Sequence, residues 1–213
     1  MGLTWLYFSM AGIMALALAV FGSVFMTQTQ LYDAKDNELL LSMPIRPLHI
    51  LMSRMAVLLV LTGVFSLAAL LPAYAVYAVA FGVTAQLVIG WVLSAAALIL
   101  LAQAVCCALG WVLHWLLSRL RNKAAVSLAF TVLFLVLYFY FYANANNLLT
   151  QLMLSGEQIA AAVQGAAWPL YAVGMGMSGS LLYTLFTAAL GAGAFALVSR
   201  VLAASFARTV AAG

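Results

Sequence analysis

The longest run without a charged side chain extends from Met55 to Ser118, 64 residues between Arg54 and Arg119. About 20 apolar residues cross a bilayer as a helix, so this run is long enough for two crossings and a turn. The whole chain is 68% hydrophobic and 6% charged, which leaves too little charge for the surface of a soluble domain. The alternating pattern of a membrane barrel is absent. The sequence therefore predicts an all-α integral membrane protein.

Five transmembrane helices are predicted. Gly82 and Thr84 interrupt the long run and mark a turn between two of them. The first span follows a terminus without Lys or Arg and is longer than the apolar part of a signal peptide, so we expect it to be retained. We expect one transmembrane domain over residues 1–213, with spans near 4–26, 55–80, 86–113, 124–143 and 178–198.

The basic residues fall on alternate connections between these spans. The loop 27–54, the loop 114–123 and the C-terminal tail carry all eight Lys and Arg, whereas the turn near Gly82 and the connection 144–177 carry none. The positive-inside rule then predicts that the N-terminus lies outside and the C-terminus in the cytoplasm. We expect the outer connection to form interfacial helices, anchored by Trp168 and broken by Pro169.

The sequence carries no catalytic or phosphate-binding motif. Patterns such as G-x-x-x-x-G-K-[ST], H-E-x-x-H and G-x-S-x-G are absent, so we expect neither enzymatic activity nor a cofactor bound by this chain. The predicted spans contain no charge, which disfavours ion-coupled transport. Gln103 is the strongly polar residue deep in a span. We expect it to make either an interhelical contact or a substrate contact. Cys106 and Cys107 are expected to be small buried residues.

Three of the four acids fall between positions 33 and 38, in the stretch LYDAKDNELLLSMPIRP of the first cytoplasmic loop. Asp33 is a suitable N-cap for a short helix, and Pro44 ends it. Leu39 to Leu41 spread over about 200° of that helix, because each residue turns it by 100°. This pattern fits a docking site for a cytosolic partner or a solvated loop whose leucines enter the lipid interface.

The stretch YDAKDNELLLSMPIRPLHILMSRM (32–55) resembles the cytoplasmic loop of exporter permeases of the ABC transporter superfamily, with its K-D-x-E-x-L-L-S-x-P-like pattern. The resemblance implies a coupling helix at 33–43 that docks on a separate cytosolic ATPase, which would bind ATP and Mg. It also implies a second membrane subunit, identical or different, in a bacterial plasma membrane. The eight basic residues are accounted for by topology and do not indicate nucleic-acid binding. The implied docking residues are Asp33, Lys35, Asp36, Glu38, Leu39, Leu40, Pro44 and Arg46.

Permeases of that superfamily usually have six spans and begin in the cytoplasm, so this chain departs from them and is expected to be partial or truncated. Two other functions are compatible with the sequence. One is a non-transporting scaffold or sensor subunit that docks a cytosolic protein through the same loop. The other is a lipid-modifying membrane enzyme, which is disfavoured because no constellation of carboxylate, His and Ser lies near either interface.

Overall fold

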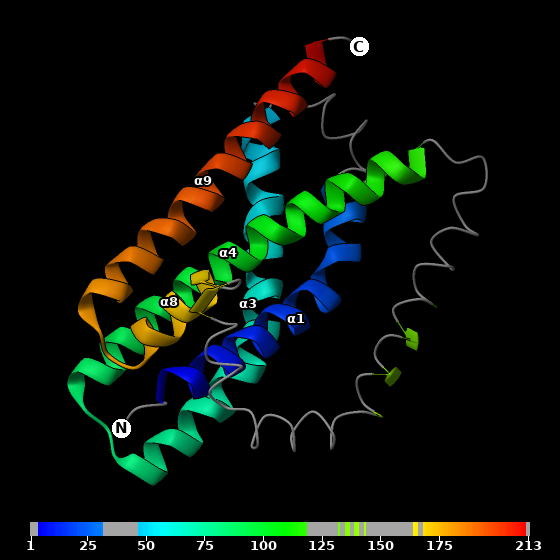
Figure 1. Ribbon diagram of the computed structural model, residues 1–213. Helices are drawn as coiled ribbons and strands as arrows, with labels where there is room; N and C mark the ends of the chain where they lie inside the picture. The colour runs from blue at the N-terminus through cyan, green and yellow to red at the C-terminus, as the bar shows by residue number, and fades with distance from the viewer. Residues whose placement is uncertain are drawn as a thin grey trace. The chain divides into compact units, whose positions relative to one another are not determined.

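The computed structural model describes residues 4–31, 47–118 and 168–211, together with isolated positions between 132 and 165 (Figure 1). The three long segments are helical except at two turns, 82–84 and 178–180. No strand occurs among the described residues, and the all-α prediction is confirmed. The described helices are α1 (Thr4–Leu31), α3 (Pro47–Phe81), α4 (Ala85–Ser118), α8 (Trp168–Met177) and α9 (Leu181–Ala211).

Within the described residues, four helices are long and apolar enough to cross a membrane. The predicted span at 124–143 lies largely outside the described residues, so the fifth crossing stays a prediction. Each of these helices extends beyond its predicted span at one end, α1 to Leu31, α3 to Pro47, α4 to Ser118 and α9 to Ala211, because a helix continues beyond the hydrocarbon layer where water can solvate its side chains. The four candidate spans are Thr4–Leu31, His49–Phe81, Ala85–Leu113 and Leu181–Ala203.

The predicted turn at Gly82 is confirmed. Gly82 has a φ of 82°, in the left-handed region that glycine adopts without steric cost. Its N–H donates to the carbonyl of Ala78 at 3.0 Å, which satisfies one carbonyl of the last turn of α3. Residues 82–84 then lead directly into α4.

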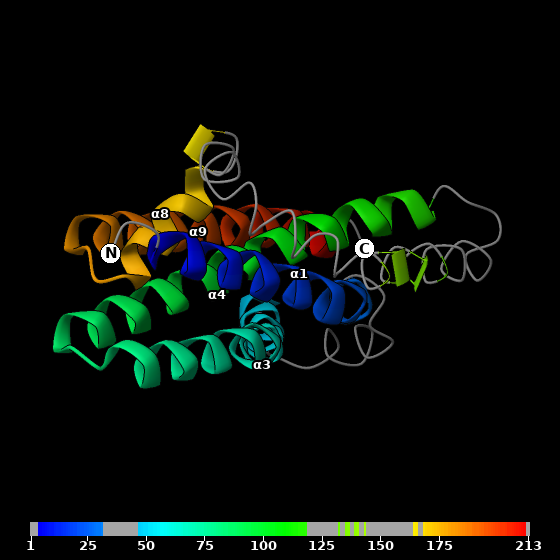
Figure 2. The same cartoon turned by 60° about the horizontal axis from the view of Figure 1, so that its bottom comes forward.

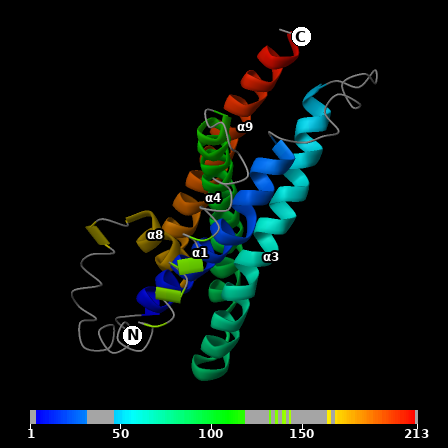
Figure 3. The ribbon, with the colours of Figure 1, turned by 90° about the vertical axis from the view of Figure 1, so that its right-hand side faces the viewer.

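Contacts divide the chain into two compact units, residues 1–111 with 169–213 and residues 112–168. The single domain over residues 1–213 stays a prediction. In the first unit, the long helices run along a common direction (Figure 3). The start of α1 and the two turns, 82–84 and 178–180, lie at the same end (Figure 2). We call this the turn end, and the opposite end, which holds Leu31 and Pro47, the loop end.

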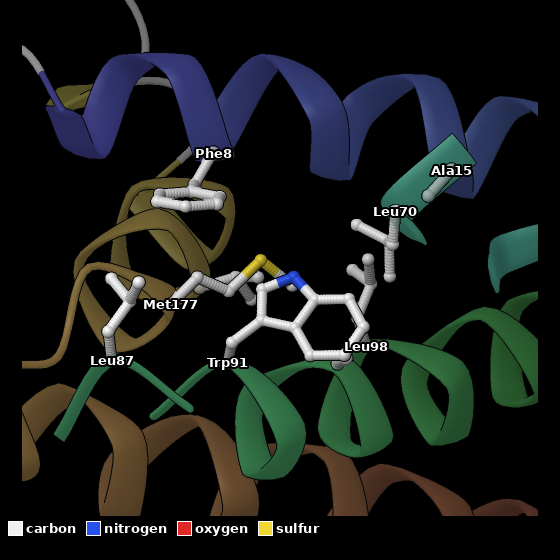
Figure 4. Packing of buried hydrophobic residues seen from close by; sticks show 9 residues of the cluster. Phe8, Ala15, Leu70, Leu87, Trp91, Leu98 and Met177 are labelled. Carbon is white, nitrogen blue, oxygen red and sulfur yellow. The ribbon is translucent and has the colours of Figure 1, made fainter. Parts of the chain in front are cut away.

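Each end is held by its own apolar cluster. The turn-end cluster joins α1, α3, α4 and α8, with the Trp91 indole packed between Met177 and Leu98 (Figure 4). The loop-end cluster joins α1, α3, α4 and α9. The turn-end cluster consists of Phe8, Ala15, Leu70, Leu87, Trp91, Ala95, Leu98, Val173 and Met177. The loop-end cluster consists of Leu31, Leu51, Met55, Leu58, Cys107 and Leu202.

The short helix α8 forms the end of the connection 144–177. Pro169 is its second residue, where no backbone N–H is needed for helical bonding. Residues 166 and 167 lie outside the described residues, so the predicted break at Pro169 and the interfacial placement stay predictions. Val173 and Met177 of α8 belong to the buried turn-end cluster. The chain reverses after Met177, at Gly179 with a φ of 100°, and continues as α9.

Candidate functional site: a polar layer and a loop anchor

Between the two apolar clusters, α1, α3 and α4 each contribute a polar side chain at the same level. These are Ser23, Thr62 and Gln103, all fully buried. The Thr62 hydroxyl donates to the Gln103 amide oxygen at 2.6 Å and lies 3.3 Å from the Ser23 oxygen. Together with Cys106, whose sulfur is 3.2 Å from the Ser23 oxygen, these residues form what we call the polar layer.

The hydrogens of the polar layer can be assigned from these contacts. The Ser23 hydroxyl donates to the carbonyl of Ala19, one turn earlier in α1. The one hydrogen of the Cys106 thiol has two acceptors within reach, the Ser23 oxygen at 3.2 Å and the carbonyl of Ala19 at 3.7 Å. The Gln103 amide nitrogen donates to the sulfur of Cys107 at 3.4 Å. The polar layer therefore links three helices through neutral donors and acceptors.

The chemistry of the polar layer is that of a neutral hydrogen-bonding site. It contains hydroxyl, amide and thiol groups and no carboxylate or imidazole, so it has no group suited to acid–base work near neutral pH. Among the described residues, no group of three or more His, Cys, Asp or Glu is placed to hold a metal ion. Both cysteines are free and buried, as predicted.

Glycines hold α8 between α1 and α4. A side chain on Gly174 would overlap the Ser9 hydroxyl and the carbonyl of Trp5, and one on Gly176 would overlap the Ser94 hydroxyl. A Cβ on Gly90 would come within 2.5 Å of the Gly176 carbonyl. The backbones therefore approach as closely as small residues allow in membrane helices.

Aromatic side chains gather at the turn end. Tyr77 contacts Phe8 and Phe81 with ring centroids 4.9 Å apart in each pair, and the Tyr74 ring is 4.6 Å from Trp91. Trp and Tyr are enriched where membrane proteins meet the headgroups. The structure thus puts an aromatic group at the end opposite to the basic residues Arg54 and Arg200.

At the loop end, Arg54 connects the two helices that enclose the loop 32–46. Its guanidinium donates to the carbonyl of Gln30 in the last turn of α1 at 2.8 Å. No described residue of α1 can donate to this carbonyl within the helix, and a cation is favoured near a helix C-terminus. Leu31 and Leu51 pack in the same cluster, so the loop begins and ends at neighbouring points.

The predicted docking residues, Asp33, Lys35, Asp36, Glu38, Leu39, Leu40, Pro44 and Arg46, all lie outside the described residues. Their placement stays a prediction. Gln103 is located as expected for an interhelical contact. Ser23 and Thr62 were not predicted, although the four-residue spacing of Ser23 with Thr27 and of Thr62 with Ser66 marks a polar stripe on each helix.

A family model described as "membrane protein of 12 TMs" matches residues 2–211, nearly the whole chain. The chain belongs to this family. No curated protein and no solved structure matches it. The family assignment confirms a multi-pass membrane protein.

This family assignment corrects the resemblance to ABC exporter permeases, because the matching family is a different one. The resemblance depended on one short loop motif. Acids, leucines and prolines between two spans also arise from helix capping and interfacial packing, so such a motif does not distinguish families. The family description also bears on size: twelve helical spans of about 20 residues would need about 240 residues. This chain has 213, so it holds fewer than twelve spans.

Proposed function

We propose that this chain is a non-catalytic scaffold subunit of the plasma membrane that presents the loop 32–46 to a cytosolic protein. The observation that carries the proposal is the Arg54 contact with Gln30 at 2.8 Å. It ties the C-terminus of α1 to α3 beside the loop. A loop whose two ends are fixed at neighbouring points loses less entropy when a partner orders it.

The chemistry of the loop defines the partner. Asp33, Asp36 and Glu38 supply negative charge, and Leu39 to Leu41 supply an apolar surface. A complementary partner has an apolar groove with a basic rim, because interfaces combine an apolar centre with a polar edge. The chain itself is expected to bind no cofactor and no nucleic acid.

The proposal includes a cytoplasmic loop end and C-terminus. The distribution of basic residues supports this orientation, and the aromatic group supports the turn end as a place where the helices meet lipid headgroups. Basic residues are confined to the connections expected at the loop end, and the aromatic group of Tyr7, Phe8, Tyr77 and Phe81 lies at the turn end.

The proposal also includes a second membrane-embedded subunit. The exposed side of α9 carries the small residues Ala189, Ala192, Gly193 and Ala196, and a Cβ on Gly193 would meet nothing within 4 Å. Small residues four apart allow membrane helices to approach closely.

The docking proposal is tested by photo-crosslinking in living cells. A photoreactive amino acid at Asn37 should give an adduct with a soluble protein, whereas the same group at Thr84, in the turn 82–84, should not. Asp36→Lys with Glu38→Lys should abolish the adduct and leave membrane insertion unchanged, because charge reversal repels a basic rim. No adduct at Asn37, or an adduct that survives the charge reversal, would contradict the proposal.

A further inference from the structure

Two buried polar atoms have no hydrogen-bond partner within the described residues, the Ser66 hydroxyl and the indole nitrogen of Trp91. Buried polar groups are nearly always bonded, because leaving one unpaired costs free energy that water would otherwise supply. The Trp91 nitrogen is surrounded by the apolar turn-end cluster (Figure 4). The Ser66 hydroxyl, in contrast, lies next to the polar layer. Of the two unpaired atoms, it is the one with other hydrogen-bonding groups close by.

The position of Ser66 follows from the helix spacing. Thr62, Ser66 and Leu70 are four residues apart on one face of α3, and all three are fully buried. Side chains four apart on a helix have Cβ atoms about 5–6 Å apart. The Ser66 hydroxyl is therefore one helical turn from the Thr62 hydroxyl, on the side of the polar layer that faces the turn end.

The antiparallel pairing of the helices defines what faces Ser66. Ser23 contacts Thr62, and Tyr7 nearer the turn end donates to the carbonyl of Ala73, so α1 runs opposite to α3. Ser66 is then at the level of Ala19. On α4, where Gln103 contacts Thr62 and Trp91 stacks on Tyr74, it is at the level of Leu98 to Ala102. The small side chains Ala19 and Ala102 are both fully buried at this level.

We infer that Ser66 and Thr62 form a binding site for one neutral hydroxyl oxygen, from water or from an uncharged amphipathic alcohol of the diacylglycerol type. The Ser66 hydroxyl donates to that oxygen, and the ligand's hydroxyl donates to the Thr62 oxygen. Two hydrogen bonds of about 2.8 Å that meet at a bent oxygen span about 4.5 Å, which two hydroxyls can reach when their Cβ atoms are about 5–6 Å apart. The Thr62 oxygen can accept this bond because its own hydrogen is directed to Gln103.

The neutrality of the ligand follows from the surrounding residues. Helices α1 and α4 contain no Asp, Glu, Lys or Arg at any position. The one charged residue of α3 is Arg54, two helical turns from Thr62 and bonded to α1 at the loop end. A charged group at this depth would lack a counter-ion and would be costly. This inference does not depend on the docking of a partner at the loop 32–46.

The sign of a stability change tests the site. In nanodiscs of phosphatidylcholine, Ser66→Ala should lower the Tm, because it removes a hydrogen bond to the ligand. If the hydroxyl is unpaired, the same change should raise the Tm or leave it unaltered, since an unsatisfied group is removed. Ser53→Ala is the matched control on α3, because the Ser53 hydroxyl donates to the carbonyl of Ile50 in its own helix at 2.9 Å.

The source of the oxygen is resolved by adding dioleoylglycerol to the nanodiscs. A rise in the wild-type Tm that is lost in Ser66→Ala identifies an alcohol, and an unchanged wild-type Tm together with a lower Tm of the variant identifies water. Ser66→Cys keeps a weaker donor, so its Tm should lie between the Tm of the wild type and that of Ser66→Ala. It replaces Ser66→Ala in the test if that variant does not fold. A Tm equal to or higher than that of the wild type would overturn the inference, whether it is measured for Ser66→Ala or, if that variant does not fold, for Ser66→Cys.

Discussion

The turn end and the polar layer hold the same helices together by different means. At the turn end, glycines let backbones meet, and α8 is fixed by shape. In the polar layer, polar side chains join three helices, through the Thr62–Gln103 hydrogen bond and the Ser23–Cys106 contact. Lipid tails are as apolar as the helices, so the hydrophobic effect contributes little to helix association in a membrane, and close packing and hydrogen bonds replace it. The two regions should therefore respond to different substitutions.

The largest effect is expected where backbone meets backbone. Gly174→Val puts a side chain against the Ser9 hydroxyl and the Trp5 carbonyl, and the carbonyl cannot rotate away as a side chain could. We expect a loss of about 3 kcal/mol or more, at the upper end of overpacking effects. Thermal unfolding of the purified protein in detergent measures it.

Gly193→Val is the matched control for this change, because a Cβ there meets nothing within 4 Å. It should leave the thermal stability of the isolated chain unaltered. Equal losses for the two variants would show that helix propensity, and not the fit of α8, causes the effect.

A smaller effect is expected in the polar layer. Gln103→Leu keeps the volume but removes the acceptor of the Thr62 hydroxyl. We expect a loss of about 1 kcal/mol, because interhelical hydrogen bonds in membranes average about 0.6 kcal/mol and reach about 1.7 kcal/mol. Gln86→Leu, at an exposed position of the same helix, is the control. A loss as large as that of Gly174→Val would remove the distinction between the two regions.

The smallest effect on stability is expected at Arg54. Arg54→Gln shortens the side chain and removes the charge that faces the C-terminus of α1. A partly exposed contact of this kind contributes about 0.3–1 kcal/mol. The loop 32–46 should nevertheless be cleaved faster by added protease, because its ends are no longer tied. Arg200→Gln, at an exposed position of α9, should not change the cleavage rate.

Much of the fold can be predicted from composition, because the length of an apolar run and the position of Gly82 directly set the spans and the turn. The burial of α8 could not be predicted. Its sequence WPLYAVGMGM is moderately apolar, which suits an interfacial helix as well as a buried one. The burial of α8 depends on the fit of Gly174 and Gly176 against Ser9 and Ser94, which are far away in the sequence.

One part of the candidate site could be predicted from the sequence and another part could not. Gln103 stands out because an amide in an apolar run needs a partner. Its partner Thr62 does not stand out, since Ser and Thr in membrane helices often bond to their own backbone, as Thr27 does with the carbonyl of Ser23. The resemblance of the loop to ABC exporter permeases was wrong because a short motif was read as a family trait.

In the orientation that we propose, the loop 32–46 faces the cytoplasm and the turn 82–84 faces the outside. Single cysteines at Asn37 and Thr84, probed with a membrane-impermeant maleimide in intact cells, test it directly. The native Cys106 and Cys107 are buried and should give little background. We predict that the cysteine at position 84 reacts in intact cells and the one at position 37 only after permeabilisation. Reaction at position 37 in intact cells would contradict the account.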